Sequence, residues 1–171
     1  MKKLLTLLAT MSITLSSHSF SATFPSLCGK DLNGSPWKAP VGFPGEKTLL
    51  LIGFDEPQQV FIDSWIKGMK LESIGSALPW VEMPLIENPG VFMRWFIDTG
   101  MRGGIRDKAT RARVWTAYTD KKAFLESCGI TTTGTISVLV VERDGTILAS
   151  ETGSFTEAGA KRILKALQME K

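Results

Sequence analysis

The feature of this sequence that most constrains its fold is a pair of uninterrupted apolar runs, TLLLIGF at 48–54 and TISVLVVE at 135–142. Such runs are typical of strands buried on both faces, because a strand with one face in water alternates apolar and polar residues. A strand of this kind lies inside a sheet that carries further layers above and below it. The two runs therefore predict a layered α/β fold.

The segments around these runs alternate between helical and strand patterns. Helices are expected over about 57–70, from Asn88-Pro89 to the glycines at 100–104, over 121–127, and at the C-terminus, where Ala160, Ile163, Leu164 and Leu167 form an apolar stripe. Further strands are expected over 78–86, 114–118 and 146–151, with a hairpin around 32–37. This order predicts a mixed β-sheet with helices on both faces.

Two expectations concern the helix that follows Asn88-Pro89. Its aromatic residues are expected to face inward, where they would pack on the sheet: Phe92, Trp95 and Phe96. The basic stretch 101–113 that follows is expected to be a loop, because Gly100, Gly103 and Gly104 weaken a helix. The five tryptophans of the chain are likewise expected in the core.

The N-terminus resembles a secretory signal peptide. Lys2 and Lys3 precede an apolar run of about 12 residues and then a small, polar stretch up to Ala22. An uncleaved anchor is the weaker alternative, because a membrane span needs about 20 apolar residues. The sequence therefore predicts a signal peptide over 1–22 and a single domain over 23–171, exported to a periplasm and not integral to the membrane.

Composition excludes several classes of function for this mature chain. The only histidine, His18, lies in the predicted leader, so His-based zinc sites and Ser-His-Asp triads are excluded. The formal net charge is +3 before the leader is removed, which is too small to indicate a nucleic-acid-binding protein. No motif for a metal or a cofactor is present, so neither is expected.

The chain resembles the thioredoxin-like superfamily, and within it the peroxiredoxin-like branch. The resemblance rests on GKDLNG at 29–34, TLLLIGF, Trp115 with Asp120, CGI at 128–130, the hairpin TISVLVVERDGTIL and the capped last helix. It implies a three-layer sandwich around a mixed central sheet. The segment MRGGIRDKATRARVW at 101–115 also resembles exported bacterial relatives of the mitochondrial ATP synthase assembly-factor family.

The sequence departs from this resemblance where the redox cysteines of thioredoxins would stand. After the first core strand it reads Asp55, Glu56, Pro57 and Gln58, and Thr133-Gly134-Thr135 occupies the place of the cis-proline. No catalytic residue is therefore expected at this former active-site position. The two carboxylates either form a ligand or cation site or simply complement the helix dipole.

Two cysteines remain as candidates for sulfur chemistry, Cys28 and Cys128. An even pair in an oxidising compartment predicts a disulfide between them. The alternatives are two separate thiols or one catalytic thiol. No basic residue stands at a spacing that would activate either sulfur, although Lys30 is close to Cys28.

A cluster of positive charge gives the candidate binding residues. Arg102, Arg106 and Arg111 lie within the basic stretch and are expected to dock an acidic protein partner or an anionic surface. The alternative is a solvated loop with local ion pairs. The sequence thus predicts an exported, non-catalytic binding protein or assembly factor; the alternative is a divergent thiol peroxidase or oxidoreductase that uses Cys128 or Cys28.

Overall fold

The computed structural model describes residues 22–74 and 77–168, and most of the predicted signal peptide lies outside them. The strands are β1 (Leu27–Lys30), β2 (Pro36–Ala39), β3 (Lys47–Gly53), β4 (Trp80–Glu87), β5 (Ala117–Thr119), β6 (Ser137–Glu142) and β7 (Ile147–Thr152). The helices are the 3-10 turn η1 (Glu56–Gln58), α1 (Gln59–Gly68), α2 (Leu71–Ile74), α3 (Val91–Gly104), α4 (Lys108–Arg113), α5 (Lys121–Cys128) and α6 (Glu157–Gln168). The alternating order expected from the sequence is confirmed.

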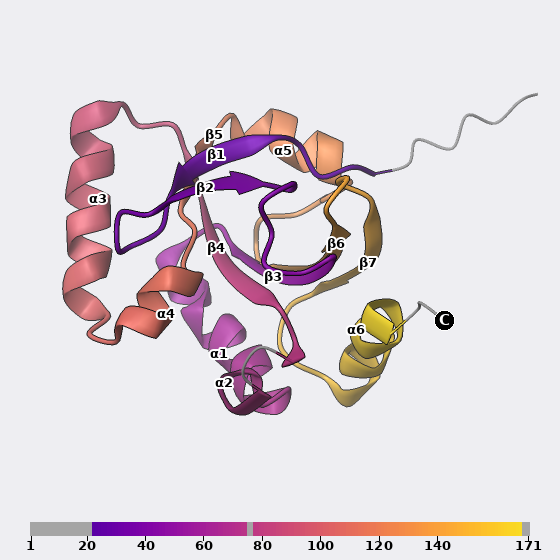
Figure 1. The fold of residues 1–171 in the computed structure, drawn as a ribbon. Helices are drawn as coiled ribbons and strands as arrows, with labels where there is room; N and C mark the ends of the chain where they lie inside the picture. Colours follow the sequence, from indigo (N-terminus) through magenta and orange to yellow (C-terminus); the bar gives the residue numbers. More distant parts are fainter. Residues whose placement is uncertain (1–21, 75–76, 169–171) are drawn as a thin grey trace, which may run out of the picture.

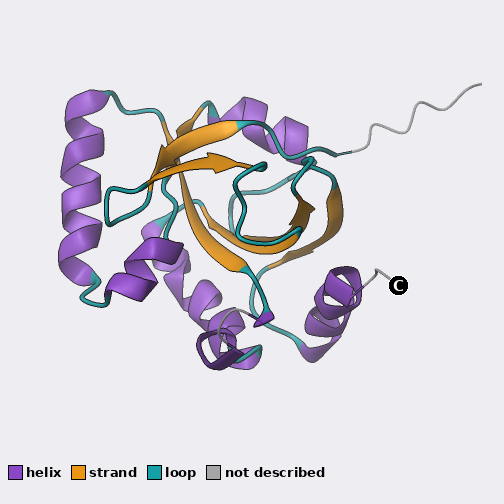
Figure 2. Ribbon diagram, in the orientation of Figure 1, coloured by secondary structure: helices purple, strands orange, loops and turns teal. Residues whose placement is uncertain are grey.

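A five-stranded mixed sheet forms the middle of the molecule (Figure 2), with strand order β5-β4-β3-β6-β7. Strands β3, β4 and β5 run parallel, whereas β6 is antiparallel to both β3 and β7. The two apolar runs of the sequence become the neighbouring strands β3 and β6, which pair from Lys47↔Glu142 to Ile52↔Ser137. They are central and buried on both faces, as their composition predicts.

Each face of the sheet has its own layer. Leu49 and Leu51 point toward the core shared with α1 and α6, where Trp65 and Ile163 are fully buried. Leu50 and Ile52 point to the opposite core, which contains Phe124 of α5 together with residues of the β1–β2 hairpin. Layers therefore cover both faces of the sheet, and the three-layer α/β fold class predicted from the sequence is confirmed.

Local signals place the ends of several elements. The Asp120 carboxylate accepts a hydrogen bond from the backbone N–H of Ala123 at 2.9 Å and caps α5. Gly129 ends this helix at φ +66°, and Gly145 turns the β6–β7 hairpin at φ +96°. The helix expected over 121–127 and the hairpin expected after the second apolar run are confirmed.

The region after β4 differs from the sequence-based expectation. The stretch 101–113, predicted to be a loop, contains the last turn of α3 and all of α4. Asp107 explains the second helix, because its carboxylate accepts hydrogen bonds from the Thr110 N–H at 2.6 Å and the Thr110 hydroxyl at 2.9 Å. A Cβ atom added at any of the three glycines of α3 would meet no atom within 4 Å, so no close packing requires glycine at these positions.

Candidate functional site

The first candidate site lies where β3 ends and α1 begins. Gln58 is buried there, and its side-chain oxygen accepts a hydrogen bond from the Phe54 N–H at 3.0 Å. Its side-chain amide donates to the carbonyl of Thr133 at 2.7 Å. Gln58 thereby ties the turn after β3 to the loop before β6, the two segments that the sequence pattern marks as the former active-site position.

The other three residues of this position are exposed. Asp55 accepts a hydrogen bond from the Glu56 N–H at 2.9 Å and caps η1, and Pro57 stands within the same turn. This capping role agrees with the interpretation that the carboxylates complement the helix start. Among residues 22–74 and 77–168, no group of three or more His, Cys, Asp or Glu side chains could hold a metal ion.

A buried carboxyl group lies beneath the first turn of α1, and the sequence analysis missed it. Glu82 of β4 pairs with Leu51 of β3 and is only 8% exposed. Burial raises the pKa of Glu82, and the nearby charge of Asp63 raises it further, while a hydrogen bond with the Gln59 side chain opposes the shift. The one acidic residue inside an apolar strand was the signal that could have identified it.

The two cysteines are free thiols in this structure, which does not contain the Cys28–Cys128 disulfide expected from the sequence. Cys28 is exposed on β1, whereas Cys128 is buried in the last turn of α5 beside the core. Burial raises the pKa of Cys128 to about 12. The geometry thus leaves one accessible thiol outside the former active-site position and one inert thiol.

The second candidate site is the outward face of α3, which the structure turns the opposite way from the prediction. Phe92, Trp95 and Phe96 were expected in the core, yet they are 79%, 63% and 64% exposed, and Val91 beside them is 86% exposed. We call these four residues the aromatic ridge. Helix α3 buries none of its residues and lies at the outer margin of the molecule (Figure 1).

Polar contacts explain why α3 presents its apolar face to solvent. The Tyr118 hydroxyl of β5 donates a hydrogen bond to the Asp98 carboxylate at 2.8 Å. The Arg94 guanidinium lies over the Tyr118 ring, 5.0 Å from its centre, and its Nη2 donates to Asn88 at 2.6 Å. Arg94 and Asp98 therefore face the sheet, on the same half-buried side as Ile97 and Met101, and this docking directs the aromatic ridge outward.

The three arginines expected to bind a partner have different roles. Arg102 donates to the Leu32 carbonyl at 2.8 Å, and Arg111 donates to the carbonyls of Ile105 at 2.6 Å and Arg102 at 2.9 Å. These two side chains connect α3, α4 and the loop after β1. Arg106 is exposed, with no hydrogen bond or ion pair to the rest of the described chain. It remains the freest of the three for a partner.

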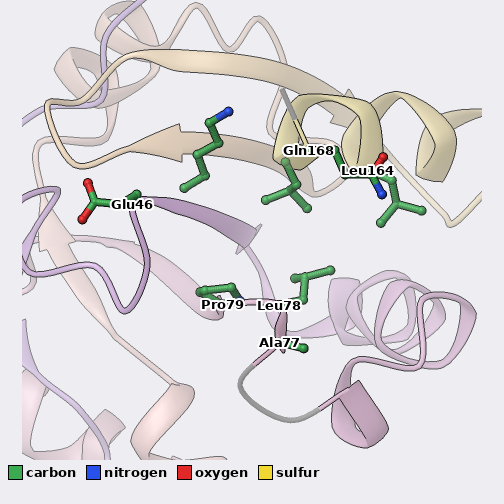
Figure 3. A pocket seen from close by; sticks show the side chains of 8 residues that line it. Glu46, Ala77, Leu78, Pro79, Leu164 and Gln168 are labelled. Carbon is green, nitrogen blue, oxygen red and sulfur yellow. The ribbon is translucent and has the colours of Figure 1, made fainter. Parts of the chain in front are cut away.

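A pocket of about 430 Å³ lies between α6 and the starts of β3 and β4 (Figure 3). Its lining residues are Glu46, Lys47, Ala77, Leu78, Pro79, Leu164, Leu167 and Gln168. Both charged residues of the lining are already engaged: Glu46 pairs with Arg143 at 2.7 Å, and Lys47 donates to the Ala166 carbonyl at 3.4 Å. The lining therefore offers little chemistry for a polar ligand.

Comparisons with known proteins show which solved structures share the fold of this chain. No protein-family model and no curated protein matches the sequence. Among solved structures, an electron transfer protein from Aquifex aeolicus aligns with a TM-score of 0.59 at 13% identity, covering 89% of this chain and 96% of its own. BsSco, from the Sco family of cytochrome c oxidase assembly proteins, aligns with a TM-score of 0.55 at 12% identity, covering 86% and 92%.

A third similar structure is the exposed lipoprotein thioredoxin Etrx1 from Streptococcus pneumoniae, with a TM-score of 0.52 at 11% identity, covering 82% of this chain and 98% of its own. These likenesses give no support to the peroxiredoxin-like branch in particular. At sequence identities this low, a shared fold does not imply a shared activity. The chain has the thioredoxin-like fold.

Proposed function

We propose that residues 23–171 form one exported domain that acts by binding a partner and carries out no thiol-disulfide chemistry. Its role would be that of an accessory or assembly factor in the cell envelope. The observation that carries this proposal is the Gln58 side chain, which is buried and hydrogen-bonded on both sides at the former active-site position. Thiol-redox catalysis in this fold requires a low-pKa thiolate at that place.

The state of the two cysteines supports the same proposal. A thiol with a pKa of about 12, such as Cys128, carries almost no thiolate at neutral pH, and the thiolate is the attacking species. Cys28 lies on the β1–β2 hairpin and not at the β3–α1 edge. Its exposure favours one second candidate function, a thiol oxidoreductase that uses Cys28.

Insulin reduction and peroxide consumption by the wild type, Cys28→Ser and Cys128→Ser separate these two functions. We expect none of the three proteins to exceed the rate in buffer. Turnover by the wild type that is lost in Cys28→Ser would refute the binding proposal and establish the second candidate. Titration with a thiol reagent checks the exposure of the two cysteines. Cys28 should react in the native protein, and Cys128 should react only after unfolding.

The proposed export has its own test. The short apolar run and the small residues after it support cleavage between Ser19 and Ala22. N-terminal sequencing of the protein recovered from the periplasm should therefore begin within that region or directly after it. A periplasmic form that still begins at Met1 would contradict cleavage.

None of the helices in residues 22–74 and 77–168 has the length and hydrophobicity needed to cross a bilayer.

A further inference from the structure

We propose that helix α3 is a membrane-surface anchor whose aromatic ridge lies in the interface of an anionic bilayer. This inference names the partner for the binding role proposed above and rests on that proposal. It starts from the unusual orientation of α3, whose apolar side is directed away from the domain. A soluble protein seldom leaves several large apolar side chains together in water without a binding role.

The ridge has the residue types and spacing of an interfacial helix. Phe92, Trp95 and Phe96 stand three and four positions apart, so their rings lie on one side of α3. The rings of Phe92 and Trp95 lie 6.4 Å apart. Tryptophan and phenylalanine on one side of a helix are typical of segments that lie flat at the boundary between headgroups and acyl chains.

Charge around the ridge identifies an anionic occupant. The stretch 88–113 carries six basic and two acidic side chains, whereas the rest of the chain after residue 22 carries 12 basic and 15 acidic side chains. Both acidic residues of the stretch have internal partners, since Asp98 accepts from Tyr118 and Asp107 caps α4. The positive charge of Arg106 and Lys108, which are exposed, is therefore available to attract anionic lipids.

The same charges disfavour a second copy of this chain as the occupant. Pairing two ridges face to face would bring together two segments that each carry an excess of positive charge. The position of α3 also favours a bilayer, because the helix stands at the outer margin of the molecule (Figure 1) and buries none of its residues. A lipid surface accepts a protruding ridge without a complementary cavity.

Vesicle binding tests the proposal, with the exported protein whose N-terminus has been determined. We expect it to co-sediment with vesicles of phosphatidylglycerol and phosphatidylethanolamine and not with vesicles of phosphatidylcholine. Phe92→Ser with Phe96→Ser should weaken binding about tenfold or more, because two aromatic side chains no longer leave water. The matched control is Val60→Ser with Leu148→Ser, two exposed apolar residues elsewhere, which should bind as the wild type does.

The electrostatic contribution has its own pair of variants. Reversing Arg106 and Lys108 to Glu should weaken vesicle binding roughly 25-fold or more, since each basic residue near an anionic surface contributes about a fivefold factor. Reversing Lys161 and Lys165 of α6, which are exposed outside the stretch, changes net charge equally and should have little effect. Raising the salt concentration should weaken wild-type binding.

Quenching by brominated acyl chains reports whether the ridge enters the bilayer. Trp95 is 63% exposed, Trp37, Trp65 and Trp80 are buried, and Trp115 is half-buried with its ring stacked on Trp37. Quenching should therefore fall mainly on Trp95 and should be largely lost in Trp95→Phe. Equal binding of the wild type and the ridge variant would overturn the proposal. A dimer in light scattering without vesicle binding, or capture of an acidic protein alone, would overturn the lipid assignment. Neither outcome changes the result of the insulin-reduction and peroxide assays. Those assays test separately whether the protein is catalytic.

Discussion

Gln58 joins two loops that are 75 positions apart in the sequence. Replacing it with Ala leaves the buried Phe54 N–H and the Thr133 carbonyl without their partner, and each unsatisfied group costs about 1–3 kcal/mol. We therefore expect Gln58→Ala to lower the free energy of unfolding by about 2–4 kcal/mol in chemical denaturation. Lys67→Ala, exposed on the same helix, should change it by less than about 0.5 kcal/mol. Equal stabilities of the two variants would show that the bridge contributes nothing.

Glu82 should make the stability of the protein depend on pH. Its pKa is raised in the folded state above the ordinary value of 4.5, so the folded protein holds the proton more tightly than the unfolded chain does. The stabilisation by the protonated carboxyl is complete below pH 4.5 and is lost as the pH rises through the folded-state pKa.

Melting temperatures of the wild type and Glu82→Gln, measured as a function of pH, check this expectation. Gln cannot ionise, so its stability advantage over the wild type should grow as the pH rises above 4.5. A constant difference between the two proteins across the pH range would mean that Glu82 does not titrate differently in the folded state.

At the scale of the element, Tyr118 holds α3 against the sheet. Tyr118→Phe removes the hydrogen bond to Asp98 and should destabilise the docking of α3 by about 1 kcal/mol. We expect faster amide hydrogen exchange in α3, with the core strands unaffected. Thr99→Ala is the matched control, because the Thr99 hydroxyl donates only to the Trp95 carbonyl within α3. Equal exchange rates in α3 of the two variants would contradict this role of Tyr118.

Elements with a strong local pattern could be predicted from the sequence, and α3 shows why others could not. The apolar runs of β3 and β6 predict their own burial, and Asp120 and Gly129 mark the ends of α5 within a few residues. An amphipathic stripe reports that a helix has two sides but not which side meets the domain. That choice depends on Tyr118, which stands on a later strand.

The candidate site was predictable to a similar extent. The sequence located Asp55–Gln58, because the position follows directly from the first core strand. It could not show that Gln58 reaches the Thr133 carbonyl, since a side-chain bridge between distant loops leaves no periodic pattern. For the same reason, it did not distinguish Arg106, which is free, from Arg102, which donates to the Leu32 carbonyl.

At the scale of the whole molecule, the β1–β2 hairpin packs closely onto the sheet region. The rings of Trp37 and Trp115 stack 5.2 Å apart, and a Cβ atom on Gly29 would lie 2.5 Å from the Trp37 ring. We expect Gly29→Ala to lower the free energy of unfolding by about 1–3 kcal/mol through overpacking. Gly100→Ala, on an exposed turn of α3, should instead raise it by about 0.5–1 kcal/mol. Thermal unfolding of the two variants measures both changes. Equal changes in the free energy of unfolding would contradict overpacking at Gly29.

The two edge strands of the central sheet, unlike the exposed face of α3, are poorly suited to bind another molecule. Strand β5 is only three residues long, and Trp115 just before it forms a bridge with Asp31. On the other border, β7 carries Glu151, which forms an ion pair with Arg162. Short strands and charged side chains at sheet borders discourage the strand-to-strand stacking from which amyloid grows. The chain can therefore expose aromatic rings on a helix while giving little opening to fibril formation.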